Sequence, residues 1–355
     1  MRNLGLDILR FVAVLLVLGH HAAPAPGANI LMLLWSRGGW VGVDLFFVLS
    51  GFLVSGLLFT EHRLHGTIRP LRFLLRRGFK IYPAFWVMIA ATVAGNMALG
   101  IETSPRTVLK ELLFVQNYFG GLWRHTWSLA VEEHFYLALA AYAAFVTRRT
   151  RSEPFASVPY VFAAVAVACL AMRVWLAMHS PQFNPRVALF PTHVRIDALL
   201  FGVLLSYLAQ YHGLMERLRA IPTSLLFAAG TLLLSPVFFI RLDLSIWMHT
   251  VGLTVFAAGS GLLVLAAYRF AASESRTLGA LGMLGSASYS MYLWHWPVLF
   301  WGGLAWRNAF GPEHNTAFIL AFFASAIGIG LFMNRLVEKP VLLLRNRLLP
   351  RFGQK

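Results

Sequence analysis

Ten stretches of mostly apolar residues, each long enough to cross a membrane, constrain this chain more than any other feature. A hydrocarbon core about 30 Å thick is crossed by about 20 residues of helix. The stretches lie near residues 6–23, 41–60, 81–99, 126–147, 156–178, 195–211, 222–240, 247–268, 285–302 and 316–338. The segments between them are too short for a soluble domain. We therefore expect an all-α, polytopic transmembrane bundle of about ten spans.

Composition excludes the other classes of protein. Of the 355 residues, 58% are hydrophobic and 12% are charged, whereas soluble domains carry about 25% charged residues. So few charges exclude a disordered chain, a coiled coil or an ordinary soluble enzyme. Cys169 is the one cysteine of the sequence, so intrachain disulfides and CxxC sites are excluded as well.

The net charge of +16 is explained by topology. If the spans alternate from a cytoplasmic N-terminus, 19 Lys and Arg residues lie inside and seven lie outside. This bias follows the positive-inside rule and predicts a multi-pass protein, in contact with membrane lipids, whose two termini are both cytoplasmic. Nucleic acid is not needed as a partner. The seven outer cations are Arg37, Arg106, Lys110, Arg124, Arg186, Arg241 and Arg307.

We expect a single membrane domain over residues 1–345, followed by a basic cytoplasmic tail over 346–355. Near the start of the second span, Gly38, Gly39 and Gly42 indicate that helices approach one another closely.

Ionisable residues inside the first span point to function, because charges in a membrane are costly. Arg10 and His21 are eleven residues apart, which places them within about 20° of one helical stripe and about 16 Å apart along the axis. They therefore define a polar seam but cannot touch through this helix alone. The alternative is an interfacial arginine and a histidine at a helix end.

Seven motifs carry a resemblance to a known family. They are residues 6–10 (LDILR) followed by His21, 42–53 (GVDLFFVLSGFL), 76–83 (RRGFKIYP), 126–136 (TWSLAVEEHFY), 195–202 (RIDALLFG), 288–297 (SYSMYLWHWP) and 338–340 (EKP). In this order, they resemble the acyltransferase-3 family of integral membrane acyltransferases, which O-acylate bacterial envelope glycans and some small molecules.

The resemblance implies a location in the plasma (inner) membrane, a donor, an acceptor and a catalytic pair. The donor is cytoplasmic acyl-CoA, which we take to be acetyl-CoA, and the acceptor is a hydroxyl of a cell-envelope carbohydrate or lipid-linked glycan. The family's Arg-x10-His signature falls on Arg10 and His21. Two positions depart from the pattern: His20 makes a tandem histidine, and Lys80 stands where the family has arginine, so a bidentate phosphate contact is not expected there.

Acyl transfer to an alcohol requires a base to remove the hydroxyl proton. Imidazole titrates near neutrality, so we assign His21 as the general base. A carboxylate would orient its ring, and Asp44 or Glu132 is the candidate. The alternative for each acid is a structural salt bridge, with Arg10, Arg173 or Arg195 as the partner.

Four cations just before the third span are the candidate CoA site. The phosphates of CoA suit a cluster of guanidinium groups, although the positive-inside rule alone predicts some of this charge. The cations are Arg72, Arg76, Arg77 and Lys80.

Polar side chains on two further spans are candidates for a substrate tunnel, or for hydrogen bonds that lock helices together. They are Ser128, Ser288, Tyr292 and His295. Arg195 with Asp197, and Glu338 with Lys339, are interpreted as structural ion pairs. The histidines lack metal-ligand spacing, so we expect neither a metal nor a permanently bound cofactor.

The sequence therefore predicts an acyl-CoA-dependent O-acyltransferase. One alternative is a transporter or lipid-linked glycan flippase, whose buried Arg, His and acidic residues form a proton relay. A second alternative is a membrane scaffold without catalysis. Because the chain ends soon after its last span, we expect the membrane domain itself to complete transfer to the acceptor.

Overall fold

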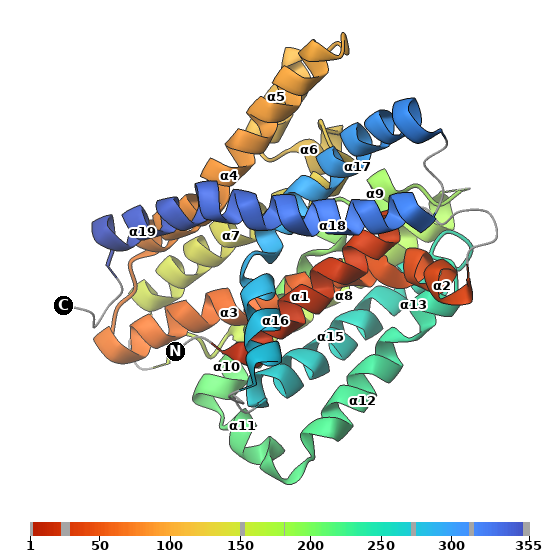
Figure 1. The fold of residues 1–355 in the computed structure, drawn as a ribbon. Helices are drawn as coiled ribbons and strands as arrows, with labels where there is room; N and C mark the ends of the chain where they lie inside the picture. The colour runs from red at the N-terminus through yellow and green to blue at the C-terminus, as the bar shows by residue number, and fades with distance from the viewer. Residues whose placement is uncertain are drawn as a thin grey trace.

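The computed structural model describes residues 3–22, 29–149, 153–180, 182–270, 275–311 and 316–350. Within these ranges every regular element is a helix (Figure 1). The long helices are α1 (Leu4–His21), α3 (Gly42–His65), α4 (Pro70–Ala98), α7 (Trp127–Arg149), α8 (Val158–His179), α10 (Ile196–Tyr211), α15 (Val251–Arg269), α17 (Ser288–Phe310) and α18 (Thr316–Met333).

Shorter helices connect the long ones or lie at their ends. They are α2 (Ile30–Gly38), α5 (Pro105–Leu112), α6 (Gln116–Phe119), α9 (Pro185–Ala188), α11 (Leu214–Arg217), α12 (Thr223–Leu234), α13 (Pro236–Phe239), α14 (Ile246–His249), α16 (Arg276–Ser286) and α19 (Lys339–Leu348). Four 3-10 turns, η1 (Gly39–Val41), η2 (Arg124–Thr126), η3 (Thr192–Val194) and η4 (Leu218–Ala220), and a π-helical turn, η5 (Asn334–Glu338), complete the described elements.

The predicted all-α membrane bundle is confirmed. Among the described residues, seven helical segments are long and apolar enough to cross a membrane, or eight if the pair formed by α10 and residues 214–220, bent by 86°, is one span. Residues 223–239 form a shorter apolar helix. Each of the ten predicted stretches is mostly helical, although 222–240 is divided between α12 and α13, and α4 begins eleven residues before the stretch 81–99. The count of about ten spans and the cytoplasmic position of both termini stay predictions.

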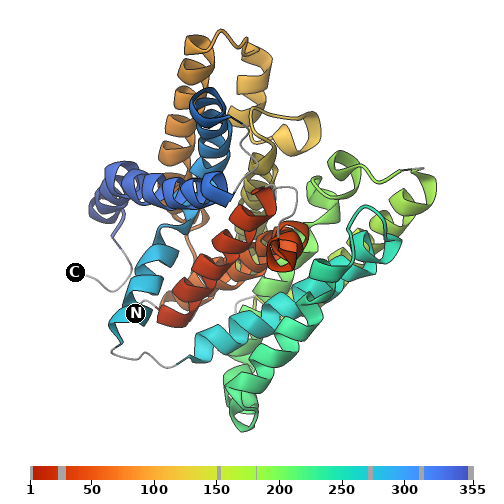
Figure 2. The ribbon, with the colours of Figure 1, turned by 45° about the vertical axis from the view of Figure 1, so that its right-hand side comes forward.

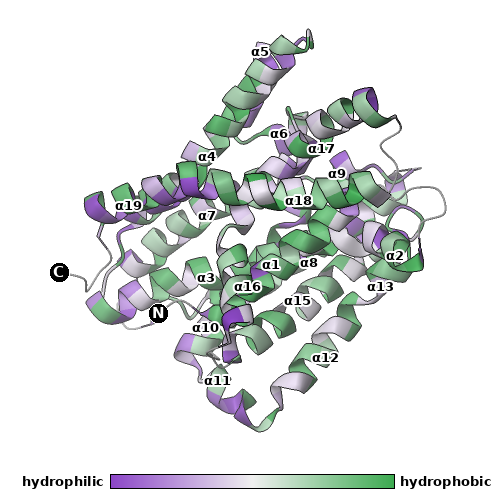
Figure 3. Ribbon diagram, in the orientation of Figure 1, coloured by the Kyte–Doolittle hydropathy of each residue, from purple (hydrophilic) through white to green (hydrophobic). Residues whose placement is uncertain are grey.

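Apolar side chains cover the outside of the bundle. Only 11% of the apolar window of α8 is buried inside the protein, so most of this helix is available to lipid. Figure 3 shows apolar residues along the middle of the long helices, with hydrophilic residues gathered near ends such as α11 and α19. This distribution is that of a membrane-embedded bundle.

Helix α1 lies at the centre, where it packs against α3, α15, α16 and α17. Figure 2 shows α1 (red) between a group that contains α12 and α15 and a group that contains α4, α17 and α18. The predicted close approach at the glycines is confirmed: a Cβ on Gly39 would lie 2.1 Å from the Leu16 carbonyl oxygen, and one on Gly42 would lie 2.3 Å from that of Ala13. These contacts fix the helix that carries Arg10 and His21.

Gly42→Ala is expected to destabilise the bundle by about 1–3 kcal/mol, because the added methyl group must push α1 away from α3. Thermal unfolding of the purified protein in detergent measures the effect. Gly328→Ala on α18 is the matched control, since a Cβ there meets nothing within 4 Å. Equal unfolding temperatures for the two variants would contradict the prediction.

Candidate functional site

A cavity of about 290 Å³ gathers many of the predicted site residues, and we name it the Arg10 cavity. Helices α1, α3, α4, α7, α16 and α17 form its walls. Apolar residues of α3, among them Val43, Phe46 and Phe47, line it together with polar side chains. The predicted site residues that line it are Arg10, Arg77, Lys80, Ser128, Glu132, Ser288 and Tyr292.

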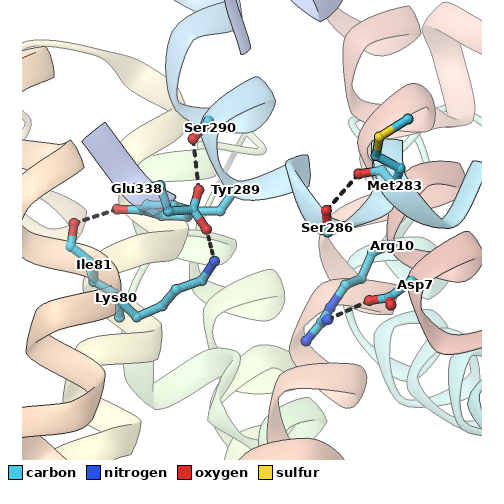
Figure 4. A network of polar contacts seen from close by, with 9 residues as sticks. All are labelled: Asp7, Arg10, Lys80, Ile81, Met283, Ser286, Tyr289, Ser290 and Glu338. Carbon is cyan, nitrogen blue, oxygen red and sulfur yellow. Dashed lines mark hydrogen bonds and ion pairs between the residues drawn. The ribbon is translucent and has the colours of Figure 1, made fainter. Parts of the chain in front are cut away.

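Two of the cations that line the Arg10 cavity, Arg10 and Lys80, are held by acids (Figure 4). Arg10 forms an ion pair with Asp7, one helical turn earlier, at 3.0 Å. Lys80 forms an ion pair with Glu338, which also accepts a hydrogen bond from Ser290 Oγ at 2.8 Å. The predicted pairing of Glu338 with Lys339 is therefore wrong, because adjacent helical residues point in different directions.

Glu132 takes part in a hydrogen-bonded chain at the same cavity. Tyr136 Oη donates to Glu132 Oε2 at 2.7 Å, and Ser50 Oγ lies 2.8 Å from Tyr136 Oη. All three residues line the Arg10 cavity. The carboxylate of Glu132 is thus placed beside Arg10 and Arg77 rather than beside His21.

A second cavity, of about 340 Å³, lies at the other end of α1, and we name it the His21 cavity. Its walls include His20, His21, His125 and Trp296. His21 also lines a third, mostly apolar cavity of about 220 Å³ between α17 and α18. No group of three or more metal-ligating side chains was found in the described ranges.

The ring of His21 is fixed by a carbonyl and by a second imidazole. Its Nδ1 lies 3.0 Å from the Val17 carbonyl oxygen and 3.2 Å from Nε2 of His295. The Nδ1 of His295 in turn contacts the Tyr292 carbonyl oxygen. A carbonyl oxygen only accepts, so each neutral ring carries its proton on Nδ1. This tautomer leaves the Nε2 lone pair of His21 able to accept a proton.

Neither of the predicted carboxylates orients His21: in the described part of the chain, the hydrogen-bond partners of its ring are Val17 and His295. Asp44 instead forms a buried ion pair with Arg195 at 2.9 Å. Arg173 pairs with Asp197, so the predicted pair of Arg195 with Asp197 is wrong. Residues two apart on a helix do not face each other, which explains the exchange of partners.

Tyr292 stands between the two main cavities. Tyr292 and Val43 line both the Arg10 cavity and the His21 cavity. The Tyr292 hydroxyl lies 2.6 Å from Ser128 Oγ and donates to the His125 carbonyl oxygen at 2.8 Å. A shared wall of two side chains therefore separates the cavities. His295 contacts His21 but lines neither of these two cavities.

The candidate CoA cluster divides into two pairs. Arg77 and Lys80 line the Arg10 cavity. Arg72 and Arg76 do not, and they donate hydrogen bonds to the carbonyls of Pro350 and Leu349. The segment after α19 is therefore held against α4. Helix α19 also runs through the predicted domain boundary at residue 345, and residues 351–355 of the predicted tail lie outside the described residues.

Sequence reasoning placed His125 on one helical stripe with Glu132 but gave it no role in the site, and it missed the buried acid Glu111. His125 makes ring contact with His295, at 4.8 Å between centroids. Glu111 is buried, and its Oε1 accepts hydrogen bonds from the Leu122 amide at 2.8 Å and from Thr126 Oγ1 at 3.0 Å. Burial raises the pKa of Glu111 to about 7. The position of His125 directly before the 126–136 motif could have indicated a role for it. Glu111 lies in no motif, so no such indication was present.

The fold and the cavities define a multi-pass membrane protein with a polar site inside its helical bundle. The chain belongs to the acyltransferase-3 family, because the family's model, described as an acyltransferase domain, matches residues 3–335.

Curated relatives point in the same direction. The chain is 25% identical over 316 residues to the O-acetyltransferase OatA of Staphylococcus aureus, which covers 83% of this chain and 50% of the relative. It is 26% identical over 319 residues to the peptidoglycan O-acetyltransferase OatA of Listeria monocytogenes, which covers 83% of this chain and 49% of the relative. The chain thus spans about half the length of the curated relatives it matches. No solved structure matches it.

Proposed function

We propose that this protein is a plasma-membrane O-acyltransferase that moves an acetyl group from acyl-CoA to a hydroxyl of a cell-envelope carbohydrate. Family membership and the acetyltransferase names of the relatives support the class of reaction. The observation that carries the proposal is the position of His21, which lines a cavity that shares a wall with the Arg10 cavity.

The Arg10 cavity is the proposed donor site. Arg10, Arg77 and Lys80 line it, and guanidinium and ammonium groups bind phosphates well. The apolar wall of Val43, Phe46 and Phe47 suits the uncharged arm and acyl end of an acyl-CoA. On the predicted topology this cavity faces the cytoplasm, where acyl-CoA is present.

For the reaction to occur, the acyl end of the donor must pass the shared wall of Tyr292 and Val43 and reach the ring of His21. The acceptor oxygen attacks the thioester carbon while its proton moves to Nε2 of His21. The C–S bond then breaks, and the coenzyme leaves as a thiolate that takes this proton from the His21 imidazolium, which restores the neutral base. Nε2 of His295 accepts a hydrogen bond from Nδ1 of His21 and so keeps the proton there, which leaves Nε2 of His21 able to accept the hydroxyl proton. For the acceptor, the relative named a peptidoglycan O-acetyltransferase suggests the glycan strands of peptidoglycan.

Purified protein in detergent, mixed with acetyl-CoA and isolated glycan strands, is expected to transfer acetyl groups without any ion gradient. Mass spectrometry of the strands detects the added acetyl group. A transporter or flippase would leave acetyl-CoA intact, and that result would overturn the proposal.

Two neighbouring arginines test the donor site. Arg77→Gln is expected to raise the KM for acetyl-CoA roughly tenfold or more, because a hydrogen bond to a charged group is lost. Arg76→Gln is the matched control, since Arg76 contacts Leu349 and does not line the cavity. Steady-state kinetics at varied acetyl-CoA measure both. An unchanged KM in Arg77→Gln would place the donor elsewhere.

A further inference from the structure

Three cations that line the His21 cavity belong to loops that the predicted topology places outside the cell, where the positive-inside rule favours few Lys and Arg residues. Arg37, Arg124 and Arg241 all line this cavity, and all three belong to the seven cations of the predicted outer loops. The positive-inside rule cannot account for them, because it favours cations on the other side. Their convergence from three distant parts of the chain on one cavity therefore needs another reason.

The charge balance of the cavity is positive. Among its described lining residues Asp243 is the one carboxylate, and Arg241 binds it with two hydrogen bonds of 3.1 and 2.7 Å. These hydrogen bonds lower the pKa of Asp243 and keep it ionised. Arg195, which also lines the cavity, is balanced by Asp44. No carboxylate among the described lining residues neutralises Arg37 or Arg124.

Arg124 is held in place by aromatic rings rather than by an acid. Its guanidinium lies 5.7 Å from the centre of the Phe190 ring. Phe190 stacks on Trp127 at 4.9 Å with the ring planes 17° apart, and Arg195 lies 5.8 Å from the Trp127 ring. Such cation–π contacts position a guanidinium without neutralising it. Arg124 is exposed and so remains able to bind an anion.

The other walls suit a carbohydrate. Trp40 and Trp296 line the cavity, and indole rings offer broad apolar faces with a polar edge. Binding sites for small molecules combine such apolar faces with a few polar or charged groups that fix the orientation of the ligand. The His21 ring stands in the same cavity, where a bound sugar hydroxyl could reach it.

We propose that the His21 cavity is the acceptor site and that it selects carbohydrates carrying an oxyanion, a carboxylate or a phosphate, which Arg124 and Arg37 bind. This inference rests on the proposed function and adds the charge of the acceptor. It distinguishes acidic glycans, such as strands with free lactyl carboxylates or saccharides linked to a lipid diphosphate, from neutral polysaccharides.

Binding without acetyl-CoA tests the inference apart from catalysis. The probes are glycan strands with free lactyl carboxylates and the same strands with those carboxylates converted to amides, titrated into the purified full chain in detergent. The acidic strands are expected to bind roughly tenfold to hundredfold more tightly, the gain of a hydrogen bond to a charged group. A lipid-linked diphosphate saccharide, tested alongside its neutral, phosphate-free counterpart, shows whether phosphate replaces carboxylate as the oxyanion.

Arg124→Gln is expected to abolish most of this preference. Arg106→Gln is the matched control, because Arg106 is another predicted outer cation, on α5, that does not line the cavity. Equal binding of the acidic and neutral members of both probe pairs, or an undiminished preference in Arg124→Gln, would overturn the inference. Failure of the proposed function is a different result, namely no turnover of acetyl-CoA whichever glycan is bound.

Discussion

Replacing His21 by alanine is expected to lower the rate of acetyl transfer by roughly 10²–10⁴-fold, the contribution typical of a positioned general base. Nε2 of His21 is the atom that accepts the hydroxyl proton, since Nδ1 is committed to Val17 and His295. Alanine removes this atom without adding bulk to the cavity. Initial rates of transfer from labelled acetyl-CoA to glycan strands measure the loss.

The tandem histidine supplies a matched control. His20 lines the same cavity, and its Nδ1 also lies against a carbonyl oxygen, that of Ser36 at 2.6 Å. It differs from His21 because it makes no hydrogen bond with His295 in the described structure. His20→Ala is therefore expected to retain far more activity than His21→Ala. Both variants must reach the membrane and purify as folded protein. A His21→Ala variant with near wild-type rate would exclude the mechanism.

Helix positions were predictable from the sequence, whereas partners across the bundle were not. The apolar stretches predicted the helices, because a helix that crosses a membrane must have a certain length and an apolar composition. The axial separation of Arg10 and His21 followed from helix geometry, and the structure places them in different cavities. Their connection through Tyr292 depends on how α17 packs beside α7, which no local pattern encodes.

The ion pairs show the same limit. The closeness of Arg195 and Asp197 in the sequence suggested that they form an ion pair. The partner of Arg195 is instead Asp44, which is 151 positions away in the sequence. Lys80 and Glu338 meet across 258 positions. Hydropathy shows that a charge is buried but not which opposite charge compensates it. The pairing of charges is set by the helix packing: α3, which carries Asp44, comes close to α10 at Gly51, where an added Cβ would lie 1.9 Å from the Leu199 carbonyl oxygen.

Asp44→Ala is expected to cost about 3–5 kcal/mol of stability, because it leaves the buried guanidinium of Arg195 without its counter-ion. Asp44 is 0% exposed and Arg195 is 2% exposed, so water cannot replace the lost partner. The pair joins α3 to the start of α10, and the pair of Arg173 with Asp197 joins α8 to the same helix. Unfolding of the purified protein in detergent, followed by temperature or denaturant, measures the loss.

The double variant Asp44→Leu with Arg195→Met decides between a structural and a catalytic Asp44. Apolar side chains of similar volume often replace a buried ion pair at little cost, so most of the stability should return. If Asp44 acts only through this pair, acetyl transfer returns as well, because His21 and His295 do not depend on its charge. Restored stability without restored transfer would mean that Asp44 or Arg195 takes part in the reaction itself. An Asp44→Ala variant as stable as the wild type would show that the pair contributes nothing to the fold.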